Sequence, residues 1–169
     1  MQIRDAMDSV QQIAKHFRDV YFGGNWTAVN VKDVLADVNW QQATTKIYHL
    51  NSIAALVFHL NYYVDPVLKV LQGEPLKASD KLSFDLPPIV SEDDWQKLIT
   101  NVLAEAELFA DQIEKVNEAI LFEDFAGIAK YGNYYRNLLG IIEHTHYHLG
   151  QIVIIKIMLN GGGSADVHL

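Results

Sequence analysis

Apolar residues recur every three or four positions along most of this 169-residue chain, and that spacing constrains the fold more than any other feature. Residues spaced in this way share one face of an α-helix, which must pack against another element to be buried. No stretch alternates strictly between apolar and polar residues, as a half-buried strand would. The segments predicted to be helical are residues 3–21, 30–38, 40–47, 52–72, 91–119 and 133–160.

Proline and glycine separate these segments. Gly73 and the three prolines after it predict an ordered surface loop over residues 73–90. Pro66 lies inside the segment 52–72. Because proline removes one helical hydrogen bond, we expect a kink there or a break near Asp65.

The number and length of the segments predict an all-α fold. Four of them are long enough for substantial helices, and short additional helices join these. A four-helix bundle is the natural way to pack such helices. We expect residues 1–160 to form a single domain of this kind and residues 161–169 to be a flexible C-terminal tail.

Composition argues against several classes of protein. The net charge is −8 and the 13 Lys and Arg residues are scattered, so we expect no binding to nucleic acid or to a membrane surface. The most apolar run, residues 151–159, contains Lys156 and is too short to span a bilayer. The chain has no cysteine, which excludes disulfides, cysteine-ligated metals and a protein thiol nucleophile. The N-terminal residues lack the apolar core of a signal peptide, so a cytoplasmic location is expected.

Two histidines of the last predicted helix have the spacing of metal ligands. His144 and His148 are four residues apart, about 40° around the helix axis, so one ion can reach both rings. Their neighbours are apolar, and buried imidazoles need partners that a metal and its surroundings would supply. His146 lies about 200° from His144 and cannot join them. Thr145 replaces the glutamate of the metalloprotease motif, so that class is excluded.

A third ligand has to come from another helix. His59 is the best candidate because it follows a strongly apolar stretch, whereas His49 precedes the predicted helix start. A lone buried histidine is more often a satisfied core residue, but three in one bundle favour a metal site. His16 and His168 are interpreted as solvated side chains. Three nitrogen ligands would leave a position for water, whose pKa zinc lowers to about 7, or for a thiol brought by a cosubstrate.

Two stretches, Asn51 to His59 and Asn137 to Ile152 with its Tyr147-His-Leu-Gly-Gln151, resemble the DinB/YfiT-like superfamily of metalloenzymes. The resemblance implies a four-helix bundle, often a homodimer, that binds a divalent metal ion, nickel or zinc. It places the metal ligands at His59, His144 and His148. Relatives of this kind include transferases and isomerases that use low-molecular-weight thiols, and proposed hydrolases. A small-molecule substrate is therefore expected.

The sequence leaves the function open among three hypotheses. The first is a metal-dependent hydrolase or thiol-dependent transferase, the second a non-catalytic metal-binding or ligand-binding bundle, and the third a bundle whose histidines only pack. No catalytic residue is assigned. Arg136 could steady an anionic substrate or pair with an acid. Side chains near the ligands that could act as acid, base or substrate contact, but more commonly pack or face solvent, are Tyr62, Tyr63, Asp65, Glu143 and Tyr147.

Overall fold

The structure is a computed structural model that describes residues 7–161, and it confirms the all-α prediction, with no β-strand in that range. No helix of this part of the chain is both long and apolar enough to cross a membrane. The longer helices are α1 (Ser9–Phe22), α4 (Ile53–Tyr62), α5 (Val64–Leu71), α6 (Glu92–Glu114) and α7 (Tyr134–Leu159). Short helical elements are α2 (Val31–Leu35), α3 (Trp40–Thr44), η1 (Asp80–Leu82), η2 (Glu118–Phe122), η3 (Phe125–Gly127) and η4 (Ala129–Tyr131).

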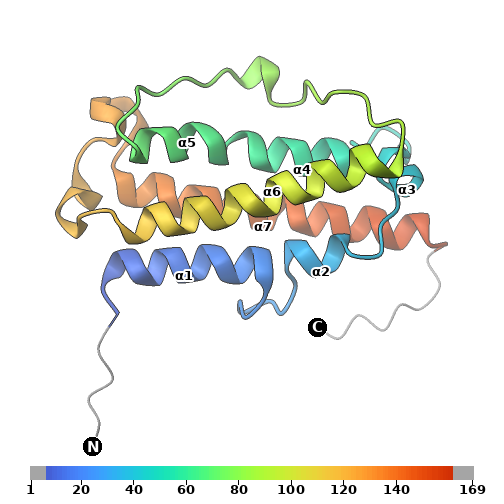
Figure 1. The fold of residues 1–169 in the computed structure, drawn as a ribbon, viewed down its shortest axis with the longest axis horizontal. Helices are drawn as coiled ribbons and strands as arrows, with labels where there is room; N and C mark the ends of the chain where they lie inside the picture. The colour runs from blue at the N-terminus through green and yellow to red at the C-terminus, as the bar shows by residue number, and fades with distance from the viewer. Residues whose placement is uncertain (1–6, 162–169) are drawn as a thin grey trace, which may run out of the picture.

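The longer helices run along one another, as Figure 1 shows. α1 packs mainly against α6, α4 packs against α7 and α6, and α5 packs against α6. The α4–α5 pair and α6 run in the same direction, so the chain between them has to return along the length of the molecule (Figure 1). This return segment, residues 73–90, is the predicted loop and contains η1.

Large apolar side chains from every long helix meet in one buried cluster. Phe17 of α1 packs edge-on against Phe109 of α6, with ring centroids 4.8 Å apart. Trp95 is fully buried at the start of α6, where its indole N–H donates to the carbonyl of Val38 at 2.6 Å. The α2–α3 region is thereby attached to α6.

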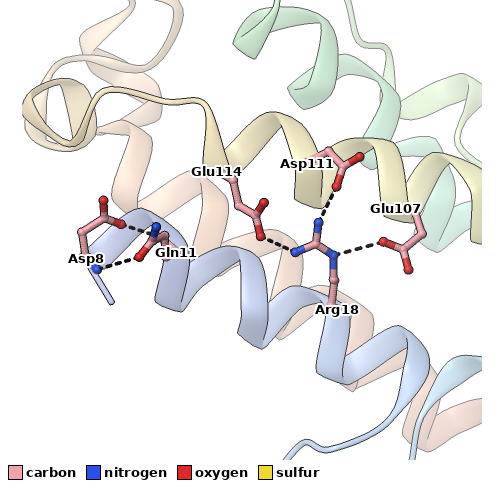
Figure 2. Close-up of polar contacts among 6 residues, drawn as sticks. All are labelled: Asp8, Gln11, Arg18, Glu107, Asp111 and Glu114. Atoms are coloured by element: carbon pink, nitrogen blue, oxygen red, sulfur yellow. Dashed lines mark hydrogen bonds and ion pairs between the residues drawn. The ribbon is translucent and has the colours of Figure 1, made fainter. Parts of the chain in front are cut away.

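Capping residues set helix ends that differ from the predicted ones. α1 begins at Ser9, not at residue 3, because Asp8 and Gln11 form a capping box (Figure 2). Met7 and Asp8 precede the helix, and Ile3 lies outside the described residues. α6 ends at Glu114 rather than Ala119, since Asn117 caps the start of η2. α2 and α3 are likewise each three residues or so shorter at their C-terminal ends than the predicted segments.

The break caused by Pro66 occurs at Tyr63, slightly before the predicted place near Asp65. Pro66 cannot donate a hydrogen bond to the carbonyl of Tyr62, four residues earlier, and its ring crowds that carbonyl. Proline is tolerated in the first turn of a helix, so a new helix, α5, starts at Val64. The break leaves Tyr63 at the junction between α4 and α5.

Arg18 connects α1 to α6 through three carboxylates (Figure 2). Its guanidinium donates to Glu107 at 3.0 Å and also to Asp111 and Glu114, which lie on the same face of α6. These contacts raise the pKa of Arg18 above its usual value, the hydrogen bond to Glu114 contributing most. Without this cation, three acids would repel one another along α6.

We expect Arg18→Met to lower the free energy of unfolding by about 1 kcal/mol at low salt, because it leaves three like charges unpaired. The loss should shrink in 1 M NaCl, where screening weakens the repulsion (a Debye length of about 3 Å). Urea unfolding at low salt and in 1 M NaCl measures the change in the free energy of unfolding. Lys15→Met, which removes one pair within α1, should cost less. A salt-independent loss for Arg18→Met would show that the arginine acts by packing alone.

Candidate metal centre

Three histidines meet where α4 packs against α7. His59 comes from α4, and His144 and His148 lie one turn apart on α7. The Nε2 atom of His144 is 3.2 Å from Nε2 of His59 and 3.1 Å from Nε2 of His148. His59 and His148 are buried, and His144 is partly buried. The structure thus brings together the three histidines predicted as ligands, in a group that could hold a metal ion.

In His59 and His148, a hydrogen bond at Nδ1 determines that Nε2 is the nitrogen with an available lone pair. Nδ1 of His59 lies 3.2 Å from the carbonyl oxygen of Ser83, and Nδ1 of His148 lies 2.7 Å from Oε1 of Gln151. Both partners are acceptors, so each Nδ1 carries the proton and donates it. In a neutral ring the other nitrogen, Nε2, then presents a lone pair. Both lone pairs are directed at His144.

The spacing of the three nitrogens suits a metal ion better than hydrogen bonding among the rings. A single N–H of His144 cannot point at both neighbouring nitrogens. A metal with nitrogen ligands at ~2.0–2.1 Å would hold them about 2.9 Å apart at right angles and about 3.3 Å apart at a tetrahedral angle. The observed separations of 3.2 and 3.1 Å lie between these limits. The donor set therefore fits a divalent ion of the kind that imidazole binds.

Burial favours the neutral form of two of the rings, which is the form that binds a metal. Burial and, to a smaller extent, the neighbouring charges of His148 and His59 together lower the pKa of His144 to about 4. Burial also lowers the pKa of His59. At neutral pH a metal would therefore not compete with protons at these two rings.

His144 differs from the other two ligands because its Nδ1 is buried without a hydrogen-bond partner. Its ring is oriented by packing instead. The ring of Tyr63 lies edge-on to it with centroids 5.0 Å apart, and the same tyrosine packs edge-on to His59 at 5.2 Å. The position of Tyr63 follows from the helix break at Pro66.

The return segment covers the outer side of His59. Beyond the Ser83 carbonyl, Phe84 stacks on the His59 ring with centroids 3.9 Å apart and planes 8° from parallel. The hydroxyl of Tyr63 donates to Asp80 at 3.1 Å. A segment far from α7 in sequence therefore orients one of the three candidate ligands. Such partners of metal ligands tune affinity and orientation.

The other side chains named as candidates have partners elsewhere or face solvent. Tyr62 donates to the carbonyl of Ser79 at 2.8 Å, and Asp65 pairs with Lys69 at 2.7 Å. Glu143 and Tyr147 are exposed, although the Tyr147 ring packs against that of His148. Of the five, only Tyr63 contacts two of the ligand rings.

The remaining histidines do not join the group. His49 is exposed in the connection before α4. His16 is exposed on α1, as predicted, and lies beside His146 of α7 with ring centroids 6.3 Å apart. His168 lies outside the described residues, as does almost all of the predicted tail 161–169.

Two cavities flank the histidines. One, of about 450 Å³, is bordered by His144 together with Tyr63, Arg136 and Gly140. The other, of about 270 Å³, is mostly apolar and is bordered by Gln151, the partner of His148. The larger cavity therefore brings a small molecule to His144, whereas the smaller one borders none of the three histidines.

Sequence reasoning missed the contribution of the return segment. Ser83 acts through its backbone carbonyl, which no side-chain pattern identifies. Phe84 belongs to a stretch that carries no spacing signal for a ligand partner. Only the crossing of residues 73–90 over α4 brings them to His59 (Figure 1).

No protein-family model matches this chain, and no curated protein or solved structure matches it either. The case for a metal centre consequently rests on the geometry of the three rings and their partners.

We expect the metal-free protein to lose stability as the pH falls from about 6.5 toward 4. In this window the unfolded chain takes up a proton at His144 and the folded chain, with a lowered pKa, does not. Because His144 is only partly buried, the loss should be about 1–2 kcal/mol. Urea unfolding at several pH values measures it, and His144→Asn should flatten the profile. An equally steep profile in that variant would contradict the assignment.

Proposed function

We propose that this chain is a metal-dependent enzyme that acts on a small molecule at the three-histidine centre. The observation that carries the proposal is the convergence of three Nε2 atoms, two of them with their lone pairs fixed by Nδ1 hydrogen bonds. Structural zinc sites are normally closed by four protein ligands, whereas catalytic sites use three. No fourth histidine or acid joins the group among residues 7–161.

We further propose that the chain is a DinB/YfiT-like four-helix bundle. The arrangement of α1, the α4–α5 pair, α6 and α7 side by side supports this proposal. So does the agreement between the motif positions, His59 and the pair His144 and His148, and the group of rings that meets in space. Nickel or zinc is the proposed ion, since both accept imidazole ligands.

Of the two reaction types, transfer to or from a low-molecular-weight thiol is favoured over hydrolysis. Bound zinc or nickel would supply a cation that stabilises a thiolate or polarises a carbonyl. Hydrolysis benefits from a general base beside the metal. In the described part of the chain, no aspartate or glutamate borders either cavity, and His49 borders only the smaller one, which none of the three histidines lines. A thiol needs no such base, and this chain has no cysteine of its own to occupy the ion.

We expect the protein to bind one Zn²⁺ or Ni²⁺ per chain and each of the variants His59→Ala, His144→Ala and His148→Ala to bind at least about 100-fold more weakly, because each removes a ligand. Gln151→Leu should weaken binding by about 10–100-fold by freeing the ring of His148. Isothermal titration calorimetry and elemental analysis measure these effects. His146→Ala is the matched control on the same helix and should bind normally.

Activity then separates the hypotheses. The loaded protein should transfer small thiols to an electrophile such as 1-chloro-2,4-dinitrobenzene, and His144→Ala should not. Hydrolysis of p-nitrophenyl acetate without thiol turnover would favour a hydrolase. Stoichiometric metal without any turnover would indicate a binding module, and metal binding unaffected by all three histidine variants would refute the site.

We also propose that the chain forms a homodimer. Tyr147, Ile154 and Met158 form an exposed apolar stripe along α7, at helical spacing. Burial of such a stripe against a second copy would remove it from water. Sedimentation equilibrium should give a dimer for the natural chain and a monomer for Ile154→Lys. A natural chain that is monomeric at high micromolar concentration would rule the dimer out.

A further inference from the structure

The larger cavity beside His144 carries two cations and no acid. Lys130 and Arg136 border it, together with Tyr63, Tyr131, Gly140 and His144. The chain as a whole has 21 acidic and 13 basic residues, so a cavity that borders two cations and no acid departs from the average surface. Neither Lys130 nor Arg136 forms an ion pair within residues 7–161. Both charges are available to a ligand.

The wall that carries these cations is held in place by specific contacts. The side-chain amide of Asn137 donates to the carbonyl of Tyr131 at 3.0 Å, which ties η4 to α7. The Lys130 ammonium lies 4.7 Å from the centre of the Tyr131 ring. These contacts hold η4 beside α7 and place Lys130 among the residues that line the cavity.

The side chain of Arg136 lies close against the backbone of Gly132. A Cβ atom at residue 132 would lie 3.0 Å from Cδ and 3.2 Å from Nη1 of Arg136, so the arginine would have to shift by a few tenths of an ångström. The φ angle of Gly132, +74°, is also one that other residues rarely adopt. The backbone therefore makes room for the guanidinium beside the cavity.

Gly140 links the arginine to the candidate metal centre. Arg136, Gly140 and His144 follow one another at four-residue intervals on α7, so they lie along one face. Glycine inside a helix costs about 1 kcal/mol relative to alanine. A Cβ atom at residue 140 would meet nothing within 4 Å, so packing does not require the glycine. Its effect is to leave the cavity floor open between the guanidinium and the histidines.

From these observations we propose that the cavity binds a small molecule with a terminal carboxylate, which Arg136 and Lys130 hold while the reacting end of the molecule lies at the three histidines. This inference rests on the proposed metal centre and names its substrate class. The planar guanidinium matches a carboxylate in a two-pronged contact. Arg136 and His144 are eight residues apart, about 12 Å along the helix, so the molecule has to be several bonds long. A volume of about 450 Å³ is in the range of small-ligand sites.

A series of thiol probes on the Co²⁺-loaded protein tests this proposal. Each ω-mercaptocarboxylic acid is compared with its ω-mercaptocarboxamide, which has the same length and no charge. Thiolate binding to Co²⁺ gives a charge-transfer absorption band from which Kd is obtained. We expect the acids to bind about tenfold more tightly than the amides, because a carboxylate adds one charge-assisted contact. The preference should be greatest at one chain length, the one that spans the distance from the metal to Arg136. Higher salt should weaken only the acids.

Two pairs of variants locate the effect. Arg136→Met should remove the preference for the acids and leave the Kd of the amides unchanged, whereas Lys115→Met, a lysine remote from this cavity in sequence and not among its lining residues, should preserve it. Gly140→Leu should fill the cavity floor and weaken all longer probes while stabilising α7. Gly150→Leu is the matched control, since Gly150 is another glycine of α7 with open space around it and it borders neither cavity. It should raise the melting temperature similarly without changing Kd.

The outcomes separate the two proposals. If Co²⁺ and the thiols bind, but acids and amides bind equally at every length, the carboxylate site is wrong and the metal centre stands. An acid preference that persists in Arg136→Met would also overturn it, because the carboxylate would then contact the metal itself. If Co²⁺ does not bind through the three histidines, the metal centre and the carboxylate site both fail.

Discussion

The mutual approach of three imidazole nitrogens is the interaction on which the functional interpretation of this structure depends. Lone pairs from His59 and His148 point toward His144 at 3.2 and 3.1 Å. Among neutral rings alone this arrangement leaves at least one of these lone pairs without a hydrogen-bond donor, in a partly desolvated place where an unpaired polar atom is unfavourable. A cation removes the conflict. The neighbouring structure supports that role, because acceptors at Ser83 and Gln151 hold two rings in the ligating tautomer.

The return segment between α5 and α6 connects the fold to this centre. It exists because the α4–α5 pair and α6 point in the same direction, so the chain must recross the molecule (Figure 1). In crossing, it places the Ser83 carbonyl and the Phe84 ring on His59. The helix break before Pro66 contributes in the same place, because it puts Tyr63 between the segment and the two nearest ligand rings. The course of the chain that the topology requires thus also orients the ring of His59.

The contacts that join α1 to α6 lie on other helices than the candidate centre. They include the edge-on packing of Phe17 on Phe109 and the ion pairs of Arg18. The side of α7 that carries His144 instead has an unpartnered ring nitrogen and, one turn earlier, a glycine that packing does not require. Unpaired buried polar atoms and residues unfavourable to a helix are found most often at functional sites. Their presence here is consistent with a ligand-binding role for this face of α7.

The sequence by itself determined the helices, most of their boundaries and the His144–His148 pair, because helical periodicity and four-residue spacing are local properties that do not depend on the rest of the chain. It also favoured His59 over His49, since an imidazole in an apolar helix needs a partner. The end of α6 and the position of the break before α5 were misplaced by a few residues, because capping by Asn117 and tolerance of Pro66 in a first turn compete with periodicity. Only the tertiary structure decided that His59 meets the pair, that Ser83 and Phe84 complete its surroundings, and that Lys130 and Arg136 share a cavity with His144. These are contacts between segments far apart in sequence or across a loop, and the direction in which helices pack, not any local pattern, brings them together.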